Sequence, residues 1–114
     1  VAIAPQISLL KVQLPAVRAS EKITFDISHV SPDGVAGGRS LSYEFCIPAT
    51  DEHLAEVLAI DPTIYHFRHS RGRIGCQRNQ YLCIGSTHNQ QWREILLAIA
   101  RLDYVQRIDE FFGE

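Results

Sequence analysis

The chain has 114 residues, of which 46% are hydrophobic and 21% are charged, and its formal net charge at pH 7 is −2. This length suits one domain with a single core, and no apolar run approaches the roughly 18 residues that a membrane-spanning helix requires. The 3 cysteines cannot all pair, and a core of this size needs no disulfide framework, so we expect free thiols and a cytoplasmic location. Because the sequence does not begin with methionine, a removed leader stays an open alternative.

Two strand-like runs come first along the chain. Residues 7–14 are densely apolar, and residues 23–27 alternate between apolar and polar side chains, which is typical of a half-buried strand. We therefore expect an N-terminal β-hairpin over residues 1–32. Residues 31–38 are rich in turn formers and predict a loop before a core over residues 40–114. The whole chain, 1–114, is predicted to be one domain.

Strand and helix patterns alternate in the first half of this core. Residues 41–47 alternate and predict a strand. A helix is expected after Thr50, because its hydroxyl can cap free amides and two acids follow it, and Asp61–Pro62 ends the helix. Residues 63–67 return to β-branched and aromatic residues and predict a second strand.

A third strand is predicted over residues 80–84. The chain must reverse between residues 70 and 80, and of the turns at 71–72 and 78–79 we favour the second, which gives strands of ordinary length. A strongly amphipathic helix follows from Trp92, opened by Thr87 and Gln90 at capping-box spacing. Residues 104–112 predict a last strand.

This order of elements predicts an α+β fold with a ferredoxin-like, split βαββαβ core: a four-stranded antiparallel sheet with two helices on one face, preceded by the N-terminal hairpin. The first and third core strands would be central neighbours. We expect their most apolar side chains to face the helices, among them Phe45, Leu82 and Ile84. The opposite, open sheet face would then carry Ser42, Glu44, Cys46, Tyr81 and Cys83. The hairpin or a second copy of the chain would cover them.

The positive charge is unevenly distributed. Residues 62–93 contain five arginines and no acid, so this segment carries +5 and the rest of the chain −7. Such asymmetry can recruit an anion, although charge on an edge strand can also serve only to prevent unwanted pairing. The predicted anion-binding residues are Arg68, Arg71, Arg73, Arg78, Ser86, Thr87 and His88. The last three lie where a strand leads into a helix, and their alternative role is only to cap that helix.

No catalytic, metal or phosphate-loop motif is present, so we expect neither a cofactor nor a metal and assign no catalytic residue. The leading hypothesis is a noncatalytic ligand-sensing or protein-interaction module that self-associates, or binds a protein or an anionic small molecule, through the open face and the arginines. One alternative is a small cysteine enzyme, with Cys83 or Cys76 as nucleophile and His69 or His88 as base. Nonspecific nucleic-acid binding is a second alternative, which the sequence disfavours because the predicted open face has a single aromatic ring.

Overall fold

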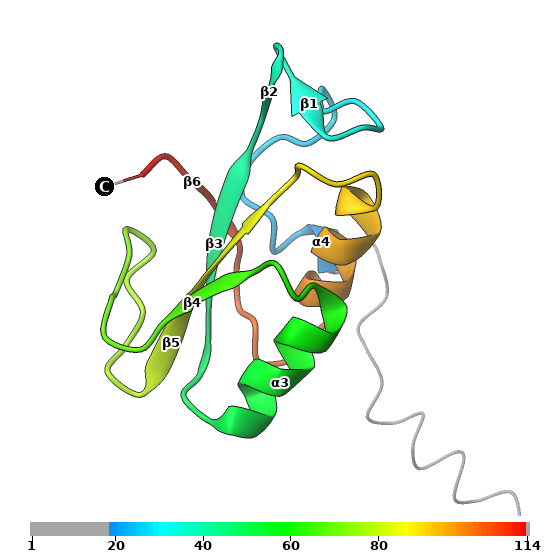
Figure 1. Ribbon diagram of the computed structural model, residues 1–114. Coiled ribbons are helices and arrows are strands. Elements are labelled where there is room, and N and C mark those ends of the chain that lie inside the picture. Colours follow the sequence, from blue (N-terminus) through cyan, green and yellow to red (C-terminus); the bar gives the residue numbers. More distant parts are fainter. Residues whose placement is uncertain (1–18, 114) are drawn as a thin grey trace, which may run out of the picture.

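The computed structural model describes residues 19–113 (Figure 1). Its helices and strands are, in order, β1 (Val35–Ala36), β2 (Arg39–Ser40), β3 (Ser42–Pro48), α3 (Asp51–Ile60), β4 (Tyr65–Phe67), β5 (Gln80–Ser86), α4 (Trp92–Ala100) and β6 (Asp109–Phe111). Within this part of the chain, β1 and β2 form a two-stranded antiparallel sheet, and the other strands form a four-stranded antiparallel sheet in the order β4-β5-β3-β6. The α+β class is confirmed, as is the central pairing of β3 with β5.

The strands at the two edges of the large sheet, β4 and β6, are shorter than predicted. The described residues contain no helix with the length and hydropathy needed to cross a membrane.

The N-terminal part differs from the predicted hairpin. Residues 7–14 lie outside the described residues, and the strand expected over residues 23–27 is wrong, because Ile23 forms only an isolated parallel bridge with Ile108. Phe25 and Ile27 nevertheless pack against the core together with Ile23. The alternation therefore marks half-buried packing without a hydrogen-bonded ladder.

A small hairpin occupies part of the predicted loop instead. Strands β1 and β2 are joined by Gly37 and Gly38, which have φ values of 60° and 82°. Two-residue turns of this kind need a positive φ at both central positions, where glycine carries no steric penalty.

The first helix follows its sequence signals. The Oγ1 atom of Thr50 accepts a hydrogen bond from the backbone amide of His53 at 3.1 Å, and α3 ends at Ile60, directly before Asp61. Leu54 and Val57 form its buried stripe. The predicted start and end of this helix are confirmed.

The start of the second helix differs from the capping-box prediction. Helix α4 begins at Trp92, and its N-cap residue Gln91 makes no side-chain capping bond. Thr87 is instead fully buried, where its Oγ1 atom donates to the carbonyl of Gly34 at 2.7 Å and accepts from the amide of Leu41 at 2.8 Å. It ties the loop before β3 to the end of β5.

Helices α3 and α4 pack side by side on one face of the large sheet (Figure 1). The fully buried side chains of Tyr43, Phe45 and Ile47 on β3 point into this core. Phe45 lies directly opposite Cys83 of β5, and residues opposite one another in a ladder share a face. Cys83 therefore faces the helices.

The predicted faces of β5 are consequently inverted. Tyr81 and Cys83 lie on the helix side, and Leu82 and Ile84 lie on the other side with Glu44 and Cys46. The prediction assumed that only one face of the sheet is covered, so that the larger aliphatic side chains must point to the helices. That assumption fails, because the second face is also covered in part and Leu82 is buried there.

Candidate functional site

The arginine-rich loop, residues 68–79, covers part of the second face of the sheet, away from the helices (Figure 1). Neither of the two turns considered in the sequence forms a tight hairpin; the loop contains a turn over residues 72–75 and another over residues 78–79. At Gly72, which has a φ of 66°, a Cβ atom would lie 2.5 Å from Oε1 of Glu44 and 2.8 Å from a methyl carbon of Leu82. Only glycine allows this approach, and it leaves the side chains of Glu44 and Leu82 each 1% exposed.

A disulfide fastens the loop to the sheet. Cys46 on β3 is bonded to Cys76, with the two Cα atoms 5.5 Å apart. The expectation of free thiols is therefore wrong for these two residues. It also means that the cover of this face, expected from the hairpin or from a second copy, comes at least in part from the chain's own loop.

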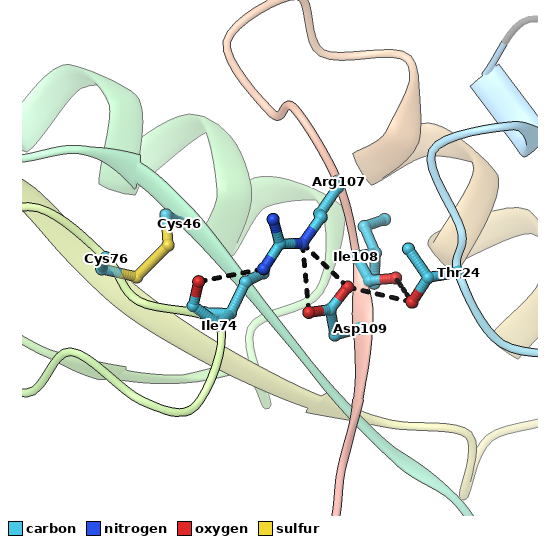
Figure 2. A network of polar contacts seen from close by, with 7 residues as sticks. All are labelled: Thr24, Cys46, Ile74, Cys76, Arg107, Ile108 and Asp109. Atoms are coloured by element: carbon cyan, nitrogen blue, oxygen red, sulfur yellow. Dashed lines mark hydrogen bonds and ion pairs between the residues drawn. A yellow bond between two sulfur atoms is a disulfide. The ribbon is translucent and has the colours of Figure 1, made fainter.

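A polar network fastens the same loop to the opposite edge of the sheet (Figure 2). The Nη2 atom of Arg107 donates to the carbonyl of Ile74 at 3.0 Å, and its Nε atom donates to both carboxylate oxygens of Asp109 at 3.1 Å. Asp109 in turn accepts a hydrogen bond from the hydroxyl of Thr24 at 2.9 Å. The loop is thus held by a covalent bond on one side and by a charge-assisted network on the other.

A buried carboxylate lies under the loop. Burial of Glu44 raises its pKa above the usual value, and the nearby Asp109 carboxylate acts in the same direction. The backbone amides of Ile74 and Arg73 and the charge of Arg73 partly offset this effect. Arg73 does not line the cationic hollow described next.

Three of the four predicted loop arginines line one surface hollow of about 540 Å³, here called the cationic hollow. Its walls are formed by Arg68, His69, Ser70, Arg71, Gln77, Arg78 and Gln80. Within residues 19–113, no carboxylate forms an ion pair with any of these arginines. The positive charge of the hollow is therefore uncompensated at short range.

The polar atoms of two of these arginines are partly fixed. The Nε atom of Arg71 donates to the carbonyl of Cys76 at 3.1 Å, while the amides of Gly75 and Cys76 donate to the Arg71 carbonyl. Arg68 lies over the ring of Tyr81, 5.0 Å from its centroid, and donates to its hydroxyl at 2.8 Å. Each guanidinium retains N–H groups for an incoming acceptor, and this partial fixation lowers the entropy that binding would cost.

The other predicted anion-binding residues lie elsewhere. Ser86 and Thr87 follow one another at the far end of β5 from Gln80, and His88 comes directly after them. Six residue steps along a strand span about 20 Å. Thr87 is buried in structural hydrogen bonds, and the hydroxyl of Ser86 accepts a hydrogen bond from the amide of His88. The structure does not bring these three together with the arginines.

The cysteine chemistry considered for an enzyme is not available in this arrangement. Cys76 is oxidised, and Cys83 is fully buried opposite Phe45. Burial raises the pKa of the Cys83 thiol to about 12, so the thiol stays protonated at physiological pH. Of the two alternative bases, His69 lines the cationic hollow and His88 lies at the far end of β5. In this arrangement neither Cys76 nor Cys83 presents a thiolate.

Sequence reasoning missed an exposed aromatic pair beside the arginines. Tyr65 and Phe67 on the edge strand β4 are 71% and 42% exposed. They lie opposite Ile84 and Leu82, which places both rings on the second face of the sheet. A further hollow, of about 630 Å³, adjoins Phe67 but not Tyr65, and its walls are His66, Phe67, Arg68, His69 and Ser70. The spacing of Tyr65 and Phe67, two positions apart, indicates that both rings share one face of the strand. Which face of the sheet this is depends on how β4 pairs with β5.

Within the described residues, no group of three or more His, Cys, Asp or Glu side chains is arranged to hold a metal ion. No family model matches the chain. Comparison with curated proteins and with solved structures gives no significant match either. The functional argument therefore depends on the geometry of the site.

Proposed function

We propose that the core is a ferredoxin-like, split βαββαβ fold. The order β3-α3-β4-β5-α4-β6, the antiparallel sheet order β4-β5-β3-β6 and the placement of both helices on one face support this assignment. Such a fold is used for many purposes and carries no function by itself.

We propose that the protein is a noncatalytic binding module that contacts an anionic group through the cationic hollow. The observation that supports this most directly is the grouping of Arg68, Arg71 and Arg78 around one hollow without a carboxylate partner in the described part of the chain. Guanidinium groups bind phosphate and carboxylate through paired N–H donors, and the field of several arginines raises the local concentration of anions. Self-association through the open face remains a separate prediction, and the loop leaves less of that face available for it.

The disulfide also affects the expected location of the protein in the cell. Disulfides persist in oxidising environments, and Cys46–Cys76 removes the ground on which a cytoplasmic location was expected. We infer that the loop adopts its bonded form in an oxidising compartment.

The test is a titration of the oxidised protein with inorganic phosphate and with tripolyphosphate, followed by NMR of the arginine Nε–H signals. We expect the signals of Arg68 and Arg71 to shift, and Arg78→Gln to weaken tripolyphosphate binding at least fivefold. Arg39→Gln is the matched control, because it removes the same charge from an exposed residue on β2 outside the hollow. Equal effects of the two variants, or no shift at the hollow, would reject the proposal.

A further inference from the structure

We propose that the anionic ligand is single-stranded nucleic acid, with bases stacked on Tyr65 and Phe67 and phosphates bound by the arginines of the cationic hollow. This inference rests on the proposed anion-binding function and names its ligand class. Binding of this kind requires a surface on which aromatic rings for the bases lie next to positive charges for the phosphates.

The rings have the required placement. Tyr65 and Phe67 lie two residues apart on β4, which separates them by about 7 Å along one face of the strand. They are exposed at a sheet edge, although aromatic side chains of this size are usually buried. Proteins that bind single strands offer such rings as platforms for successive bases.

The cationic hollow adjoins the hollow beside Phe67. The two hollows have Arg68, His69 and Ser70 as common walls where β4 ends, and together they are called the strip. Because the Arg68 guanidinium turns to Tyr81 on the helix side, the phosphates would be bound mainly by Arg71 and Arg78. The strip lies within residues 62–93, which contain five arginines and no acid. Its charge is therefore complementary to a phosphate backbone, even though the whole chain is slightly acidic.

The register of β5 removes the objection drawn from the sequence. Nucleic acid was disfavoured because the predicted open face offered only Tyr81 as an aromatic ring. Tyr81 in fact lies on the helix side, where Arg68 covers it, while the second face carries Tyr65 and Phe67. RNA-binding sheets of similar topology read unpaired bases by stacking on such rings.

A free strand fits the strip better than a duplex does. The bases of a duplex are stacked on one another and cannot lie on the two rings, whereas an unpaired strand presents base faces and phosphates together. Because the disulfide holds the arginine loop in place, we expect binding by the oxidised protein.

The experiment measures binding of fluorescein-labelled oligo(dT) and oligo(U) 12-mers to the oxidised protein by anisotropy. The double variant Tyr65→Thr/Phe67→Thr removes the rings and keeps β-branched residues that suit a strand. We expect it to weaken binding at least tenfold, because each stacked base contributes substantially to affinity. The control is Phe112→Thr, which removes a ring that is 73% exposed but follows β6 at the opposite edge of the sheet. Arg78→Gln should lower the salt dependence of binding by about one unit of slope.

Tripolyphosphate separates this inference from the proposed function. If tripolyphosphate binding depends on Arg78 while the affinity for the oligonucleotides is unchanged by the loss of the rings, the nucleic-acid inference is wrong and the anion site stands. If neither ligand binds, both are wrong. Tighter, ring-dependent binding of heparin would indicate an acidic polysaccharide and overturn the inference. Ring-dependent dimerisation in sedimentation velocity would overturn it in favour of a second copy of the chain.

Discussion

Removal of the disulfide tests the structure of the loop most directly. The perturbation is the double substitution Cys46→Ala/Cys76→Ala, which leaves no unpaired partner. The two residues are separated by 30 positions, and closing a loop of this length in the unfolded chain is worth about 3.6 kcal/mol by the chain-entropy relation. A domain of this size is stable by about 5–15 kcal/mol, so the loss would be a large fraction of the total.

The assay is urea unfolding at 25 °C and pH 7, followed by the fluorescence of Trp92, the only tryptophan in the chain. We expect the midpoint to fall by about 2 M urea, and the melting temperature by roughly 15 °C. Wild-type protein treated with a phosphine reductant should match the double variant, and the reductant should leave the variant unchanged. A double variant within about 0.5 kcal/mol of the oxidised wild type would show that Cys46 and Cys76 are not joined in the native protein.

Three further predictions concern single side chains. Because the pKa of Glu44 is raised, its stability contribution is complete below the usual pKa of 4.5 and is lost as the pH rises through the raised value. Glu44→Gln should therefore equal the wild type in urea unfolding at pH 4 and exceed it at pH 8; equal stability at both would refute this. Thr87→Val leaves the Gly34 carbonyl and the Leu41 amide unpaired and should lower unfolding free energy by about 2–4 kcal/mol. A loss below 0.5 kcal/mol, roughly the range of neutral surface changes, would contradict that role. Cys83 should react with Ellman's reagent only after denaturation, and rapid reaction of the native protein at pH 8 would show that the thiol is accessible.

Local signals were sufficient for much of the fold. The cap at Thr50, the alternation along β3 and the apolar stripe from Trp92 are each encoded within a few neighbouring residues. Such patterns depend on burial of one face of one element, and they predicted α3, β3 and the body of α4 correctly. The lengths of the edge strands β4 and β6 were harder to predict, because they are set by pairing with a neighbouring strand.

Local patterns could not predict which side chains of β5 face the helices. On β5, Leu82 and Ile84 look like the buried side and Tyr81 and Cys83 like the open side. The structure needs small residues opposite the large rings of β3 instead: Gly85 lies against the ring of Tyr43, where a Cβ atom would come within 2.6 Å. Leu82 meanwhile finds its cover in the loop, so both faces of the strand are buried and alternation no longer tells them apart.

Only part of the candidate site could be predicted, because some of it depends on contacts between residues far apart in the sequence. The accumulation of arginines without acids is visible in composition, and three of the four predicted loop arginines do share a hollow. The Cys46–Cys76 pairing has no local signal, because it joins residues far apart along the chain. The pairing of Tyr65 and Phe67 with that hollow depends on strand register, which is a property of the assembled sheet.

Strand β3 supplies alternate side chains to two different layers: Phe45 enters the helix core, and Cys46 anchors the loop. Neither layer can open far without displacing the strand that supports the other. The two layers should therefore melt as one cooperative unit, and an anion held by the loop would protect the distant helices against unfolding as well.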